Sequence, residues 1–283
     1  MGKCVASMVL AMLAVACARP EEARRTASIA RVVSLVPSMT ETIVALGERS
    51  RLVARTDYDL ARDLASLPSV GGTIDPSLER ILALRPDLVL VWQDSGLPPV
   101  KTRLEALGVR TEPVATSSLG DFRRSLARLG ELLEVPERAA RLVRAIHDSL
   151  DAVEAWVAQR PPVRVFYMVW PNPLVTTGAG TYVDSLITLA GGVNIFADAP
   201  TAWPTVTFEE LLRRDPDVIV WPRRLDAGDT AAQALRSRPG WRRLRAIRGG
   251  RLVSVDVDLF NRPGPRVALA ARTLARALHE ERP

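Results

Sequence analysis

Side chains that could perform catalysis are few in this sequence of 283 residues. The only histidines are His147 and His279, and both fall in predicted helices where we expect exposed positions rather than a catalytic base. No Gly-x-Ser-x-Gly motif marks a nucleophile. Glu41, Asp57 and Asp59 have the chemistry of an acid–base pair, but nothing in their spacing brings them together. The sequence therefore predicts a protein that is not an enzyme.

Metal and cofactor chemistry is limited in the same way. Cys4 and Cys17 are the only cysteines, which excludes a disulfide framework, a cysteine-based zinc site and an iron–sulfur cluster. Two histidines also exclude a multi-histidine metal site. The Gly-Ala-Gly run at 178–180 lacks the third glycine of a dinucleotide-binding loop and is better explained as a turn. We predict no resident metal or cofactor.

Aromatic side chains are the more informative group because the chain has only five Phe, six Trp and three Tyr. Four of them fall where the pattern predicts loops at strand ends: Tyr58, Trp92, Trp170 and Trp203. The carboxyl ends of parallel strands are where α/β proteins bind ligands. Rings at these positions would stack on a large, flat and partly apolar ligand. Core packing is the alternative for any single ring.

The elements that would position these rings alternate between strand and helix. Short apolar runs at 31–37, 87–92 and 109–114 predict buried strands, and 52–54 predicts a further short one. Helices are predicted at 40–46, 78–84 and 100–107, the first with Ser38 as N-cap and Gly47 at its end. This alternation indicates a mainly parallel sheet.

A long helical stretch interrupts the alternation. Residues 121–133 predict one amphipathic helix, and 137–159 predict a second that begins after Pro136 and ends before the prolines at 161 and 162. At 1.5 Å per residue the second helix would span about 35 Å. Strand–helix alternation then resumes, with strands at 163–169, 217–221 and 251–257 and helices at 182–189, 208–213 and 267–281.

The second half of the chain repeats the first. Residues 78–90 align without gaps with residues 208–220, and the Ala-Leu-Gly at 45–47 matches the Leu-Ala-Gly at 189–191. We predict two similar Rossmann-like α/β lobes joined by a single long rigid helix. The first lobe would cover 31–120, the connecting helices 121–160 and the second lobe 161–283. A junction of two lobes is a favoured place for a small ligand.

The N-terminus has the pattern of an export signal. Residues 1–16 carry one lysine and an apolar stretch of about 12 residues, too short for the roughly 20 needed to span a bilayer. The Leu-Ala-Val-Ala that precedes Cys17 resembles a bacterial lipobox, which predicts a lipidated Cys17 and a polar tether over 17–30. An ordinary small-x-small cleavage site is the alternative. We expect a periplasmic or cell-surface protein.

The formal charge is +6, from 38 basic and 32 acidic residues, which would suit a nucleic-acid partner if the basic residues were clustered. Arginines are dispersed among carboxylates, so we expect a solvated surface and no nucleic-acid partner.

Four segments together resemble a known family. VSLVPSMTE at 33–41, LERI at 78–81, PDLV at 86–89 and AGGVNIF at 190–196 are similar to substrate-binding proteins of iron-siderophore and cobalamin ABC importers. Asn-Pro at 172–173, Trp-Pro at 203–204 and DLFNRPGPR at 258–266 look more like the cobalamin-binding branch. The resemblance covers about residues 31–280. It implies a monomer with two lobes, a helical backbone, and delivery of a small ligand to a dimeric membrane permease.

The resemblance also implies roles for individual residues. Glu79 and Glu209, one in each lobe, match glutamates that dock onto arginines of the permease. The positions matching ligand contacts are Tyr58, Trp92, Trp170, Trp203 and Phe260, with Arg262 and Arg266 as basic contacts. Thr73 and Leu259 replace tryptophans found in cobalamin binders. The resemblance as a whole implies that the ligand is cobalamin or another corrinoid, with a ferric siderophore or haem as alternatives.

Overall fold

The computed structural model describes residues 28–93, 100–225 and 230–280. The predicted signal peptide, Cys17 and most of the predicted tether lie outside the described residues. Ile29, at the end of that tether, is buried in the core, and the backbone N–H of Ala30 donates to the Asp87 carboxylate. No helix among the described residues is both long enough and apolar enough to cross a bilayer.

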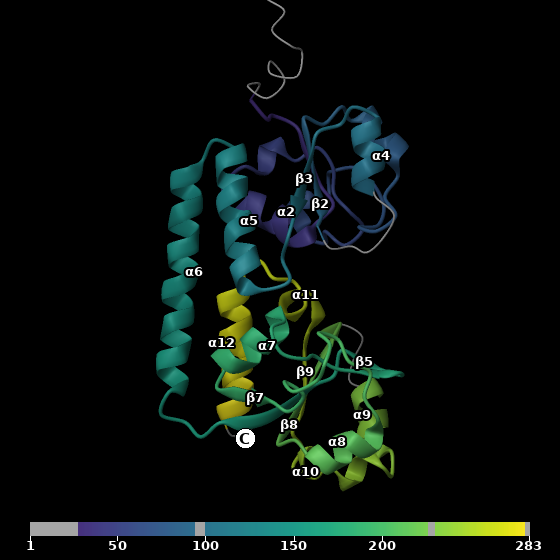
Figure 1. The fold of residues 1–283 in the computed structure, drawn as a ribbon, viewed down its shortest axis with the longest axis vertical. Coiled ribbons are helices and arrows are strands. Elements are labelled where there is room, and N and C mark those ends of the chain that lie inside the picture. The colour runs from purple at the N-terminus through teal and green to yellow at the C-terminus, as the bar shows by residue number, and fades with distance from the viewer. Residues whose placement is uncertain (1–27, 94–99, 226–229, 281–283) are drawn as a thin grey trace, which may run out of the picture.

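The described residues form two lobes, a first built around one sheet and a second built around another (Figure 1). The first lobe contains β1 (Val32–Ser34), α2 (Pro37–Ala45), η1 (Arg49–Arg51), η2 (Arg62–Leu64), α3 (Leu78–Ala83), β2 (Leu88–Trp92), α4 (Val100–Ala106), β3 (Thr111–Val114) and α5 (Leu119–Leu132). A single long helix, α6 (Pro136–Val157), follows.

The second lobe contains β4 (Val163–Tyr167), β5 (Trp170–Pro171), β6 (Leu174–Val175), α7 (Tyr182–Leu189), β7 (Gly192–Asn194), α8 (Phe208–Arg214), β8 (Val218–Arg223), α9 (Thr230–Ser237), η4 (Trp241–Arg243), α10 (Arg245–Arg248), β9 (Leu252–Asp256), α11 (Val257–Phe260) and α12 (Val267–His279). The described strands form a parallel sheet in each lobe, with order β1-β2-β3 in the first and β7-β4-β8-β9 in the second. A small antiparallel hairpin, β5-β6, lies beside the second sheet.

Strands that read as continuous apolar runs are buried on both faces. In β2, Leu88 and Leu90 pack into the core that α5 and α6 share, whereas Val89 and Val91 pack into a separate core on the other face. In the second lobe, Val218 and Val220 of β8 face the shared core and Ile219 faces the other side. Side chains alternate between the two faces of a strand, so a parallel sheet covered on both faces requires apolar residues at every position.

Helix α6 contacts both lobes, packing against α5 of the first lobe and α12 of the second (Figure 1). Its buried side chains are Ala139, Ile146, Val153 and Val157, so the first three recur every seven residues along one stripe. These side chains belong to one hydrophobic core whose members run from Ile29 to Leu278 along the chain. The predicted fold class is confirmed: two α/β lobes are bridged by a long helix.

Two local predictions are wrong. Helix α2 begins at Pro37, with Val36 as N-cap, so Ser38 lies inside the helix and its Oγ has no hydrogen-bond partner. A proline suits this first position because its fixed φ is already helical and its missing N–H would be unpaired there in any case. The predicted strand at 52–54 is reduced to a single bridge between Val32 and Leu52.

Candidate functional site

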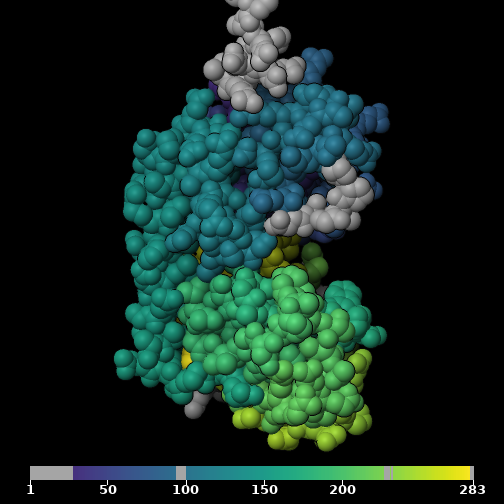
Figure 2. Space-filling view, viewed as in Figure 1, coloured from purple at the N-terminus to yellow at the C-terminus, as the bar shows by residue number. Residues whose placement is uncertain are grey.

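A cavity of about 540 Å³ lies where the two lobes meet. The first lobe contributes α2 and the 59–64 segment, and the second contributes the end of β9, α11 and the 262–266 segment. Figure 2 shows the surface hollowed between the lobes on the side away from α6. The cavity is lined by Glu41, Val44, Ala45, Asp59, Leu60, Ala61, Asp63, Leu64, Asp256, Asp258, Arg262, Pro265 and Arg266.

Glu41 and the two arginines form an ion-pair cluster across this junction. Arg266 donates from Nε to Glu41 Oε2 at 2.9 Å and from Nη2 to Glu41 Oε1 at 2.7 Å. Arg262 lies 3.9 Å from the same Glu41 Oε1 and pairs with Asp258 at 2.6 Å. The hydrogen bonds with Glu41 raise the pKa of Arg266 above its ordinary value. The two predicted basic ligand contacts are therefore already paired with carboxylates.

Other contacts also join the lobes at this level. The backbone N–H of Tyr182, the first residue of α7, donates to Ser117 O at 2.9 Å. Gly264 lies against Ser38 of α2, since a Cβ at Gly264 would come 3.4 Å from the Ser38 Cβ. The Tyr182 hydroxyl is buried without a hydrogen-bond partner, and burial raises its pKa. The junction is thus built from α2, the start of α7 and the 262–266 segment, in addition to α6.

Three of the predicted aromatic contacts present their rings to solvent. Tyr58, Trp170 and Trp203 are 52%, 59% and 50% exposed. Trp92 ends β2 and is half-buried against the shared core. Phe260 differs, because its side chain is completely buried in that core and has no surface to offer a ligand in this conformation.

Two tryptophans of the second lobe, Trp170 and Trp203, lie on or near the β5-β6 hairpin. Trp170 pairs with Val175 across the β5-β6 hairpin, and Val175 in turn bridges to Thr205, two residues after Trp203. The Trp170 indole N–H donates to Asn172 O at 2.9 Å. Trp170 therefore lies on the hairpin, and Trp203 lies in the bend just before the residue that bridges to it. Tyr58 adjoins Asp59, which lines the interlobe cavity and accepts from the N–H and hydroxyl of Thr56.

The predicted docking residues lie at equivalent places in the two lobes. Glu79 is the second residue of α3 and Glu209 the second residue of α8, and both are exposed. Ser77 caps α3 by accepting from Arg80 N at 3.3 Å, and Thr207 caps α8 by accepting from Glu210 N at 3.1 Å. Within the described part of the chain, neither glutamate has an ion-pair partner.

The two histidines differ in burial. His147 is exposed on α6 and pairs with Asp151 at 2.9 Å, as expected of a surface residue. His279 is half-buried, and its Nε2 lies 3.0 Å from Ala190 O, so the prediction of an exposed helix residue is wrong for His279. Asp57 binds the Ser69 hydroxyl and is not paired with Glu41 or Asp59. No acid–base pair is formed by these three carboxylates.

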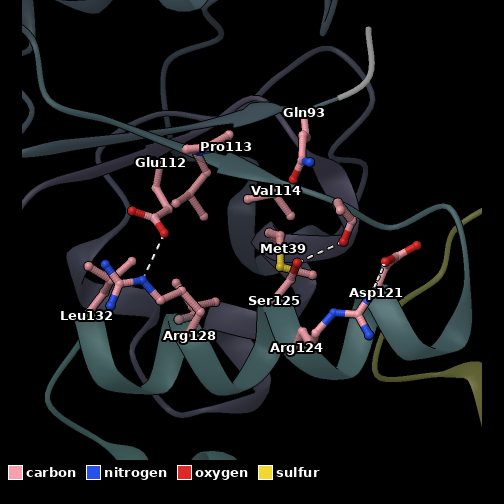
Figure 3. Close-up of a pocket in the computed structure, with 13 residues that line it drawn as sticks. Met39, Gln93, Glu112, Pro113, Val114, Asp121, Arg124, Ser125, Arg128 and Leu132 are labelled. Atoms are coloured by element: carbon pink, nitrogen blue, oxygen red, sulfur yellow. Dashed lines mark hydrogen bonds and ion pairs between the residues drawn. The ribbon is translucent and has the colours of Figure 1, made fainter.

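A second cavity, of about 160 Å³, lies within the first lobe between β3 and α5 (Figure 3). Its arginines are paired with nearby carboxylates, Arg128 with Glu112 at 2.9 Å and Arg124 with Asp121 at 2.5 Å. It contains none of the predicted ligand contacts. Its size and its position within one lobe make it a poor candidate for the site.

The sequence did not predict that Glu41 would form ion pairs with Arg262 and Arg266. Glu41 was considered only as a possible acid or base, and it is 225 residues from Arg266 along the chain. No local spacing carries such a contact.

The family model for periplasmic binding proteins matches residues 32–259, so the chain belongs to that family. It is a periplasmic solute-binding protein of ABC import, a class of binding proteins rather than enzymes, as the sequence predicted. A vitamin B12-binding protein of Photorhabdus laumondii is 30% identical over 255 residues, which cover 88% of each chain.

Two solved structures are also similar. The periplasmic vitamin B12-binding protein of Vibrio cholerae is 29% identical with a TM-score of 0.73, covering 88% of this chain and 96% of that one. A periplasmic haem-binding protein of Pseudomonas aeruginosa is 31% identical with a TM-score of 0.81, covering 90% and 94%.

Proposed function

We propose that this protein captures cobalamin or a related corrinoid between its two lobes and delivers it to an ABC permease. The observation that carries the proposal is the similarity to vitamin B12-binding proteins, at about 30% identity over nearly all of the folded chain. The exposed rings of Tyr58, Trp170 and Trp203 support it, because a corrin ring is large and flat and offers a face for stacking.

Trp92 completes the proposed contact set from the first lobe, at the carboxyl end of β2. Phe260 is left out because its side chain is fully buried. Arg262 and Arg266 act in this proposal through the carboxylates that hold them, as part of the cavity wall, rather than as free cations.

Haem is the second candidate, because the haem-binding protein of Pseudomonas aeruginosa is as similar in sequence and has the higher TM-score. Haem iron takes an axial ligand from a protein side chain, commonly His and sometimes Tyr. His147 lies on α6 and His279 caps a helix, so neither is near the interlobe cavity. Tyr58, with its exposed ring beside that cavity, is the side chain that would serve.

Delivery would use Glu79 and Glu209. Their equivalent positions at the starts of α3 and α8 suit a permease built from two copies of one subunit, each with the same basic pocket. Lipidation at Cys17 would hold the binding protein at the membrane where the permease lies. The binding protein itself is proposed to act as a monomer.

Titration of the purified mature protein with cyanocobalamin, haem and a ferric siderophore, followed by desalting and visible spectroscopy, tests the ligand. We expect retained cobalamin absorbance. Trp203→Ala and Trp92→Ala should each weaken cobalamin binding by about 1–3 kcal/mol, the range for a large apolar side chain. Leu107→Ala, which removes an exposed apolar side chain that follows α4, is the matched control and should leave affinity unchanged. Retention of haem alone would refute the corrinoid proposal.

A further inference from the structure

The interlobe cavity carries more negative than positive groups. Five carboxylates line it, those of Glu41, Asp59, Asp63, Asp256 and Asp258. Two guanidinium groups, those of Arg262 and Arg266, oppose them. Five negative charges against two positive ones leave a formal excess of three negative charges in the wall.

Both arginines are already paired with carboxylates, and the Arg266 side chain is 46% exposed. Arg266 holds both oxygens of Glu41 through two hydrogen bonds, of 2.9 and 2.7 Å, in the bidentate geometry that makes guanidinium–carboxylate pairs strong. Arg262 holds Asp258 at 2.6 Å and lies 3.9 Å from Glu41. Only 18% of the Arg262 side chain is exposed, and 21% of the Glu41 side chain. A carboxylate ligand that approached Arg266 would meet a guanidinium whose charge Glu41 already neutralises, and it would lie close to the Glu41 carboxylate.

We infer that this cavity selects ligands whose side chains end in uncharged amides and rejects ligands that carry carboxylates, with Glu41 as the residue that sets this preference. The inference rests on the proposed function, since it assumes that the interlobe cavity receives part of the ligand. Like charges brought together in a partly desolvated site repel strongly. A primary amide donates two hydrogen bonds and can pair with the carboxylates of the wall.

This preference separates the two candidate ligand classes by their chemistry. Corrinoids of the cobalamin type carry amide side chains around the ring, whereas haem carries two propionate carboxylates. Specificity of this kind arises from a repulsive group that acts against the wrong ligand as much as from contacts to the right one. Replacing Glu41 by a neutral side chain would leave Arg266 without its ion-pair partner, and the cavity would then bind anionic ligands more readily.

The test uses two probes that share one ring: dicyanocobyrinic acid heptaamide and the corresponding heptacarboxylic acid. Binding of each to the full mature protein is measured by isothermal titration calorimetry at low ionic strength. The parent protein should bind the heptaamide at least 100-fold more tightly than the heptacarboxylic acid. Glu41→Gln should reduce that ratio by tenfold or more. Glu154→Gln, the same substitution at an exposed position on α6, should leave the ratio unchanged.

The outcomes distinguish the charge preference of the cavity from the proposed corrinoid function. Equal binding of both probes by the parent protein would overturn the charge preference and leave the proposed corrinoid function standing. An unchanged ratio in Glu41→Gln would show that Glu41 does not set the preference. Failure of the parent protein to bind either probe or cyanocobalamin would refute the proposed function itself. The parent comparison remains decisive even if the Glu41 variant does not fold.

Discussion

The two lobes share a local structure that connects helix, Pro-Asp and strand, at an offset of 130 residues. Asp87 accepts from Arg31 N at 2.8 Å, and Asp217 accepts from Arg164 N at 2.9 Å. The guanidinium groups of these two arginines donate to the final turns of α3 and α8, at Leu84 O and Arg214 O. The residues before the two prolines, Arg85 and Asp215, both have positive φ values, of 44° and 38°.

The opening units of the lobes also match, at the ends of α2 and α7. Gly47 and Gly191 follow these helices with φ values of 77° and 74°. The carbonyl before each glycine is capped by a side chain from a helix far along the chain. Arg138 of α6 donates to Leu46 O at 2.7 Å, and His279 of α12 lies 3.0 Å from Ala190 O.

The ligand-facing parts, in contrast, do not repeat. The second lobe places Trp170 and Trp203 on and beside the β5-β6 hairpin, and the described strands of the first lobe include no equivalent hairpin. The first lobe uses Tyr58 and Trp92 instead. The duplicated elements therefore maintain the scaffold and the two glutamates proposed to dock onto the permease, while the proposed ligand contacts differ between the lobes. This difference would suit the proposed ligand, a corrinoid without two-fold symmetry, and the likeness would suit the proposed permease of two identical subunits.

Reversing the docking charges should have the largest effect on function. The double variant Glu79→Lys, Glu209→Lys should abolish uptake through the cognate permease and leave ligand affinity unchanged. Each lost charge pair should weaken docking by about 2–5 kcal/mol if it is buried in the complex. Uptake is measured with labelled ligand in cells or proteoliposomes. Glu154→Lys on α6 is the control for charge reversal, and normal uptake by the double variant would contradict the docking role.

The two helix-terminal glycines should respond differently to alanine. A Cβ costs about 1–2 kcal/mol in the left-handed region at either position. At Gly191 it would also lie 2.7 Å from His279 Nε2 and 3.0 Å from Val157 Cβ, whereas at Gly47 the close atom is Arg138 Nη1, at 2.9 Å, at the far end of a long side chain. We expect Gly191→Ala to destabilise by about 2–4 kcal/mol and Gly47→Ala by about 1–2 kcal/mol. Urea denaturation measures both, and equal losses would contradict the comparison.

His279, the side chain that caps Ala190 O in the second lobe, predicts a pH dependence of the unfolding free energy. Burial lowers the pKa of His279, with Arg160 and Arg251 adding to the effect. The unfolded chain therefore takes up this proton first, so the contribution of His279 to stability is lost as the pH falls from about 6.5 toward the lowered value.

Denaturation at pH 7.5 and 5.5 measures this effect in the parent protein and in His279→Gln. The loss of unfolding free energy on acidification should be smaller in the variant. Carboxylates titrate in both proteins, so the difference between the two isolates His279. Equal losses would show that His279 does not contribute.

The sequence predicted the repeated scaffold well because that scaffold depends on local pattern. Apolar runs, prolines and the 130-residue match located the long helix and the strands of both sheets except β7, whose residues 192–194 were not predicted as a strand. The ends of helices were less predictable, as Ser38 shows, because Pro37 competes for the helix start. The interlobe cluster of Glu41 with Arg266 was not predictable, since it depends on the way two distant segments pack. Phe260 was misplaced for the same reason: a motif position does not reveal burial.

The smallest expected effect distinguishes the two residues with positive φ before the Pro-Asp turns. The Arg85 side chain has no hydrogen-bond or ion-pair partner among the described residues, so Arg85→Gly should relieve backbone strain and stabilise by about 0.5–1 kcal/mol. Asp215 has the same strain, but its carboxylate accepts from Arg245 N at 2.9 Å and Arg245 Nε at 3.1 Å. Asp215→Gly loses both bonds and should destabilise by about 1 kcal/mol. Thermal and urea denaturation give the sign of the change in unfolding free energy for each variant. Stabilisation by both substitutions would mean that the side-chain contacts of Asp215 contribute nothing beyond the shared backbone strain.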